Sequence, residues 1–164
     1  MNRKTNWSEI IVYHDILYKN NAVFWMPSNK IYIYYLVKKY DVFHEYILDH
    51  EKKHYLTFNC DNNIVIKIIL DICNEWSGAW INTTNKELKN NKIQYMKELS
   101  EIKKNKIMIK NIHIFMEKLC EIKPTRKIWL YSKIVEYLRP DSKILILLII
   151  LLILVEILWI LKII

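Results

Sequence analysis

The residues best suited to chemistry lie at positions 50–54, where the sequence reads His50-Glu51-Lys52-Lys53-His54. Histidines four positions apart lie one above the other on the same face of an α-helix, so their imidazole rings can converge on one metal ion. The glutamate between them would lie beside the metal, where it could take a proton from a water molecule that the metal activates. The pattern predicts a zinc site with Glu51 as general base, provided that the segment is helical.

A catalytic zinc site needs a third protein ligand and keeps its fourth position open for water. Glu75 follows His54 by 21 residues and falls on a second predicted helix. Asp71 lies about one turn earlier on the same face of that helix and competes for the role. His113 is a more distant option. Both carboxylates could also be ordinary solvated side chains on a helix surface.

The flanking segments predict the elements that would position these residues. Asp41 can cap a helix that runs to about Phe58, and a second helix extends from about Ile64 to Trp80. Upstream, the apolar and aromatic residues at 22–26 and 31–35 predict two short strands, joined by a turn at 27–29. The expected order is therefore a strand pair, the motif helix and a ligand-bearing helix.

This order of elements, with an Asn-Glu pair at positions 74–75 on the second helix, resembles the gluzincin metallopeptidases and especially their minimal members. The resemblance covers about residues 22–80. It implies hydrolysis of peptide bonds, with an extended substrate pairing to the strand at 31–35 as an edge strand. It implies these roles: His50, His54 and Glu75 as zinc ligands and Glu51 as general base.

One feature departs from the family pattern. The two residues between the glutamate and the second histidine are normally uncharged in gluzincins, whereas this chain has Lys52 and Lys53. If the motif is genuine, the helix must have an exposed flank. A tyrosine such as Tyr55 or one of its neighbours could stabilise the oxyanion that forms during hydrolysis.

The composition changes after residue 85. Residues 86–122 are highly charged, with apolar residues recurring every seven positions, which predicts an amphipathic helix pair or one bent helix. In residues 123–143, Lys and Arg alternate with aromatic side chains, as in segments that contact lipid headgroups or in an ordinary amphipathic helix ending at Pro140. We therefore divide the chain into a metallopeptidase domain (1–85), a basic amphipathic region (86–143) and a transmembrane anchor (144–164).

The anchor is predicted from apolar length. Residues 144–155 are all Ile, Leu or Val, and the eighteen residues 144–161 carry one charge, that of Glu156. This length suffices to cross a bilayer core, and the segment has no polar face of the kind that a soluble helix shows. Nearly all Lys and Arg precede it, so the positive-inside rule predicts a single-pass membrane protein whose soluble part faces the cytoplasm.

The net charge and the cysteine content indicate which classes of binding partner and covalent cross-link to expect. The net charge of +8 suits acidic lipid or nucleic acid. The Lys-rich stretch at 103–110 alternates with Ile and Met as an amphipathic helix does, so we do not expect a nucleic-acid partner. The three cysteines stand far apart and form no CxxC pair, which excludes a disulfide framework.

The sequence thus predicts an α+β fold: a small β-sheet, an H-E-x-x-H helix, a second ligand-bearing helix, a helical region and a C-terminal transmembrane helix. The predicted function is that of a membrane-anchored zinc metalloendopeptidase acting on peptides or proteins. The alternative is a tail-anchored basic helical adaptor that binds acidic lipid or a partner protein without catalysis. An adaptor should tolerate Glu51→Gln and His54→Ala, whereas a peptidase should not.

Overall fold

A three-stranded sheet forms one side of the protein in this computed structural model, which describes residues 5–15, 21–60, 63–103 and 123–160. The strands are β1 (Ile11–His14), β2 (Ala22–Trp25) and β3 (Lys30–Tyr34). Their order is β1-β3-β2, with β1 parallel and β2 antiparallel to the central β3. A single helical turn, α1 (Trp7–Ile10), precedes the sheet.

The hairpin between β2 and β3 confirms the predicted strand pair and its turn. The turn is a short 3-10 helix, Met26–Ser28, followed by Asn29 with a φ of 53°. Asparagine adopts this left-handed conformation more readily than most residues because its short polar side chain can bond locally. The sequence analysis did not predict β1, a short strand at the edge of the sheet.

Helices α2 (Asp41–Cys60) and α3 (Ile64–Thr84) lie side by side, with α2 between α3 and the sheet. Both confirm the predicted helices. The side chain of Asn63 caps α3 by accepting hydrogen bonds from the backbone of Val65 and Ile66. The helix continues through Gly78 and stops at an extended Asn85, a few residues beyond the predicted end.

The core joins the sheet to α2 and to α4 (Lys86–Lys103). Ile31, Ile33 and Tyr95 are fully buried, and the hydroxyl of Tyr95 donates a hydrogen bond to the side chain of Asn21 (2.7 Å). Apolar residues at the seven-residue spacing of α4 thus join this core, where α4 contacts α2 and a 3-10 helix at Tyr35–Lys39. This packing fixes β2 and α2 relative to each other.

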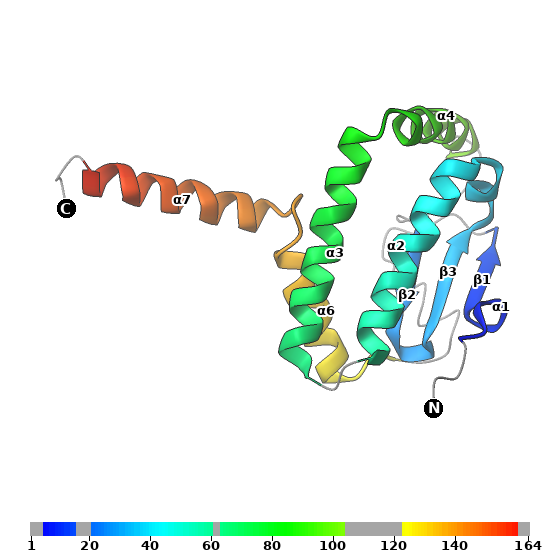
Figure 1. The fold of residues 1–164 in the computed structure, drawn as a ribbon, viewed down its shortest axis with the longest axis horizontal. Coiled ribbons are helices and arrows are strands. Elements are labelled where there is room, and N and C mark those ends of the chain that lie inside the picture. The colour runs from blue at the N-terminus through cyan, green and yellow to red at the C-terminus, as the bar shows by residue number, and fades with distance from the viewer. Residues whose placement is uncertain (1–4, 16–20, 61–62, 104–122, 161–164) are drawn as a thin grey trace.

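Two further helices complete the described chain. Helix α6 (Arg126–Tyr137), capped by Thr125, packs against α3. Helix α7 (Lys143–Ile160) points away from the other elements (Figure 1). The described chain is mostly helical with a small three-stranded sheet.

The predicted transmembrane helix is wrong, and with it the α+β class as stated and the single-pass membrane location with a cytoplasmic domain. Among the residues that the structure describes, no helix is both long and apolar enough to cross a membrane. The physical reason is that the apolar run has a charged residue at each end. Lys143 and Glu156 both lie within α7 and leave twelve uncharged residues between them. Twelve helical residues extend about 18 Å, well short of a hydrocarbon core of about 30 Å.

Candidate metal centre

Three of the predicted site residues come together between α2 and α3. The Nε2 atoms of His50 and His54 lie 3.1 Å apart, and Glu75 Oε1 lies 3.5 Å from His54 Nε2. One ligand atom from each residue lies within 4.8 Å of the other two, close enough to hold one metal ion. His54 and Glu75 are each only 12% exposed. Two imidazole nitrogens and one carboxylate oxygen form a donor set that suits zinc.

The surroundings of the two histidines favour opposite charge states, and zinc would have to displace the proton that the carboxylates favour on His54. Burial, followed by the neighbouring His54, Arg139 and Lys53, lowers the pKa of His50 to about 3, so its ring is neutral at physiological pH. Burial alone would lower the pKa of His54, but its hydrogen bond to Asp71 and the nearby carboxylates outweigh burial and raise it. A metal ion would relieve the contact between two ring nitrogens by accepting both lone pairs.

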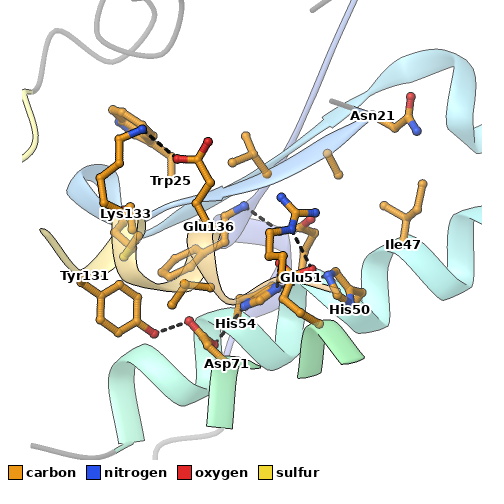
Figure 2. Close-up of a pocket in the computed structure, with 18 of the residues that line it drawn as sticks. Asn21, Trp25, Ile47, His50, Glu51, His54, Asp71, Tyr131, Lys133 and Glu136 are labelled. Carbon is orange, nitrogen blue, oxygen red and sulfur yellow. Dashed lines mark hydrogen bonds and ion pairs between the residues drawn. The ribbon is translucent and has the colours of Figure 1, made fainter. Parts of the chain in front are cut away.

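Asp71 lies behind His54 and not in the ligand cluster. Its Oδ1 is 2.9 Å from His54 Nδ1, and its Oδ2 accepts a hydrogen bond from the hydroxyl of Tyr131 on α6. A carboxylate accepts only, so Nδ1 must carry the proton, and Nε2 of a neutral ring then presents its lone pair to the cluster. Of the two carboxylates left open by the sequence, Glu75 offers an oxygen to the cluster, whereas Asp71 lies against His54 and Tyr131 (Figure 2).

Asp71→Asn should weaken zinc binding by about 10- to 100-fold, because outer-shell carboxylates fix the tautomer and orientation of a ligand histidine. Zinc affinity measured by competition with a chromophoric chelator checks this. Asp49→Asn is the matched control, because Asp49 lies on the surface of α2 in an ion pair with Lys53. Equal zinc affinities of the Asp71 variant and the wild type would show that His54 needs no such support.

Glu51 points into the same cavity from the next position along α2. Its Oε2 accepts a hydrogen bond from the backbone N–H of Phe24 at 2.7 Å (Figure 2). Burial raises the pKa of Glu51, partly opposed by His54 and by the Phe24 hydrogen bond. A carboxylate with a raised pKa is a better proton acceptor near neutral pH, as a general base requires.

Gly78, the single glycine of the chain, provides room for the ring of His50. A Cβ atom at this position would lie 2.9 Å from His50 Nδ1 and 3.2 Å from the hydroxyl oxygen of Tyr46. That hydroxyl donates to the carbonyl oxygen of Gly78 (2.8 Å), and the ring of Tyr46 stacks on His50. The missing side chain therefore lets α3 approach the ring of His50 closely.

Gly78→Ala should displace His50 and weaken zinc binding at least about tenfold. Alanine should by itself stabilise the helix by about 1 kcal/mol relative to glycine. A loss of zinc affinity without a loss of thermal stability therefore separates displacement of the ligand from general damage. Ser77→Ala, at an exposed neighbouring position, is the control, and a Gly78 variant with unchanged zinc affinity would contradict this account.

The cluster of His50, His54 and Glu75 borders a cavity of about 700 Å³ between β2, α2 and α6. The prediction that residues 31–35 form the substrate-facing edge strand is wrong, because β3 is the central strand. The edge beside the cavity belongs to β2. The Asn21 carbonyl accepts a hydrogen bond from the Tyr34 N–H, on the side of β2 that pairs with β3, whereas the Phe24 N–H is directed to Glu51 on the other side. Alternate residues of β2 therefore direct their backbone groups toward the cavity. The backbone groups of Ala22 and Phe24 thus lie on the open edge.

Helix α6 and the turn after it supply site residues that sequence reasoning did not find. Lys133 and Glu136 form an ion pair on the wall of the cavity (2.8 Å). Arg139 Nε lies 3.2 Å from Glu75 Oε2, the second oxygen of the candidate third ligand. No motif or spacing links these residues to positions 50–75, and the only signal was the interleaving of cations and aromatics in residues 123–143.

Other residues considered in the sequence lie elsewhere. Tyr55 packs against Trp7 and Phe24 and does not line the cavity. His44 is paired with the hydroxyl of Tyr13 (2.8 Å), and His113 lies outside the described residues. Lys53 pairs with Asp49 on the surface and Lys52 lies over the ring of Trp7, so α2 has the exposed flank that the charged motif requires.

Comparison of the chain with protein-family models, with curated proteins and with solved structures gives no match. The resemblance to gluzincins rests on the motif and the order of elements alone.

Proposed function

We propose that this protein is a zinc-dependent peptidase. The observation that supports the proposal most is the convergence of His50, His54 and Glu75 beside the buried carboxylate of Glu51, at a cavity bordered by an open strand edge. Structural zinc sites are usually closed by four protein ligands, whereas the described residues supply three here, at the wall of a cavity.

Each residue has a distinct role in this proposal. Bound zinc would polarise the scissile carbonyl group and lower the pKa of a water molecule. His50, His54 and Glu75 hold the ion, and Asp71 keeps His54 in the required orientation. Glu51 takes the proton from the attacking water and passes it to the leaving amine. The hydrogen bond from Phe24 holds the Glu51 carboxylate in place.

The substrate we propose is a peptide segment in an extended conformation. The outer edge of β2 offers the backbone groups of Ala22 and the carbonyl of Phe24 to an added strand, since the Phe24 N–H is already bonded to Glu51. Recognition through the backbone gives affinity with little sequence preference, so the cavity walls must supply any selectivity. An unstructured protein is therefore the appropriate first substrate.

The test is zinc-dependent cleavage of an unstructured protein such as casein by the full chain. Chelator-treated protein should be inactive, and stoichiometric zinc should restore cleavage. Magnesium at the same concentration should not, because it prefers an octahedral set of oxygen ligands. Cleavage that persists after complete zinc removal would contradict the proposal, as would a zinc-loaded chain that cuts no unstructured protein.

A further inference from the structure

Helix α6 reaches the candidate metal ligands from behind, through a chain of three side chains. The hydroxyl of Tyr131 donates a hydrogen bond to Asp71 Oδ2, and Asp71 Oδ1 lies 2.9 Å from His54 Nδ1 (Figure 2). Tyr131 is 3% exposed, and the side chains of Asp71 and His54 are 7% and 12% exposed. Because all three side chains are shielded from solvent, a water molecule cannot readily replace the Tyr131 hydroxyl if it is lost.

The hydroxyl of Tyr131 acts as the donor in this chain. Burial, followed by the hydrogen bond to Asp71, raises the pKa of Tyr131, so the phenol keeps its proton at neutral pH. Asp71 then has one oxygen for each partner. A carboxylate held at both oxygens cannot turn about its Cβ–Cγ bond, and a fixed carboxylate fixes the imidazole ring of His54.

The attachment of α6 to α3 depends on the carboxylates beside the metal position. The buried residues of α6 are Tyr131 and Val135, so apolar packing covers only a small part of the helix. Just after the helix, Arg139 Nε lies 3.2 Å from Glu75 Oε2. One end of the α6 segment therefore contacts the residue behind His54, and the other end contacts the candidate third ligand.

We infer that Tyr131 is a positioning residue of the metal centre, through which zinc binding and the docking of α6 on α3 stabilise each other. The inference rests on the proposed zinc site. Docked α6 fixes Asp71 and, through it, the ring of His54. Bound zinc in turn fixes His54 and Glu75, which holds the partners of α6 in place. Linkage requires each event to favour the other by the same factor.

This coupling has a consequence for the substrate cavity. Lys133 and Glu136 lie on the same helix as Tyr131 and line the cavity beside the candidate metal ligands. Zinc loading therefore holds in place a wall of the cavity that receives the substrate, as well as the ion itself.

Tyr131→Phe isolates the hydroxyl, because it keeps the ring that packs edge-to-face against Phe58 with centroids 6.1 Å apart. It should weaken zinc binding by the full chain at least about fivefold, measured by competition with a chromophoric chelator. Tyr137→Phe is the matched control, because Tyr137 lies on the same helix at a position that is 48% exposed. It should leave zinc affinity unchanged.

A double-mutant cycle separates positioning from a merely structural role. Asp71→Ala removes the link between Tyr131 and His54. In that background, Tyr131→Phe should change zinc affinity by less than about twofold, because two changes that act through one shared partner are not additive. A tyrosine that only supports the fold would weaken zinc binding equally in both backgrounds.

Hydrogen exchange measures the reverse effect. Zinc should slow amide exchange in α6 of the wild-type chain at least about fivefold, and Tyr131→Phe should remove most of this protection. This measurement decides the case by itself if Asp71→Ala does not fold.

Three results overturn the inference while the zinc site stands: unchanged zinc affinity of Tyr131→Phe, an equal loss in the Asp71→Ala background, or exchange in α6 that zinc does not slow. A wild-type chain that binds no zinc overturns the proposed function as well.

Discussion

Glu51→Gln should lower kcat for peptide hydrolysis by about 10²- to 10⁴-fold while the protein keeps its zinc. Glutamine has the same shape and can still accept the hydrogen bond from Phe24 through its amide oxygen, but it cannot take a proton from water. The loss should fall on kcat with little change in KM, because the carboxylate acts on the proton and not on substrate affinity.

The measurement is steady-state hydrolysis of a quenched fluorescent peptide, with zinc content determined on the same samples. Glu87→Gln is the matched control, since Glu87 lies exposed in the first turn of α4. A Glu51→Gln enzyme that retains wild-type kcat would remove the general base from the mechanism. Loss of zinc together with activity would indicate that Glu51 supports the fold of the site and not the chemistry.

His54→Ala should abolish stoichiometric zinc binding. It removes one of the three ligands and also leaves Asp71, only 7% exposed, without its histidine partner. Two of three ligands would remain, and the buried carboxylate would lose a hydrogen bond. The expected zinc content falls from about one ion per chain to near zero after dialysis.

His44→Ala is the matched control for this change. His44 lies on the same helix, but its partner is Tyr13 and it is no part of the ligand cluster. Zinc content is measured by mass spectrometry of the purified chains, with circular dichroism to compare folding. A His54 variant that folds and keeps one tightly bound zinc would show that the ion binds elsewhere.

The sequence could predict what local geometry determines. His50, Glu51 and His54 belong to one helix, so their relative positions follow from a rise of 1.5 Å and 3.6 residues per turn. The strand pair at β2 and β3 followed from β-branched and aromatic runs that flank a turn. These features need no knowledge of how distant parts of the chain pack.

What depends on packing was left open or predicted wrongly. Asp71 and Glu75 share one face of α3, and only the rotation of that helix against α2 places Glu75 at the metal position and Asp71 behind His54. The substrate-facing edge was assigned to the wrong strand because β1, a short strand from earlier in the chain, pairs with the far side of β3. Strand order is a long-range property that alternation of residue types does not specify.

The site residues of α6 and of the turn after it also depend on long-range packing, so the sequence did not predict them. Tyr131 and Arg139 contact Asp71 and Glu75 from sixty or more positions further along the chain. Their residue types, a tyrosine and an arginine among many aromatics and cations, carry no spacing signal. The transmembrane prediction failed for a different reason: it accepted Glu156 inside the span, although Lys143 and Glu156 leave only twelve uncharged residues between them.

X-ray absorption spectroscopy at the zinc edge, on the full chain loaded with one equivalent of zinc, tests the metal centre most directly. The account predicts two imidazole rings in the first coordination sphere, with the remaining ligands oxygen and no sulfur. Detection of sulfur ligands, from cysteines such as Cys60 or Cys73, or a sphere without imidazole, would contradict a centre formed by His50, His54 and Glu75.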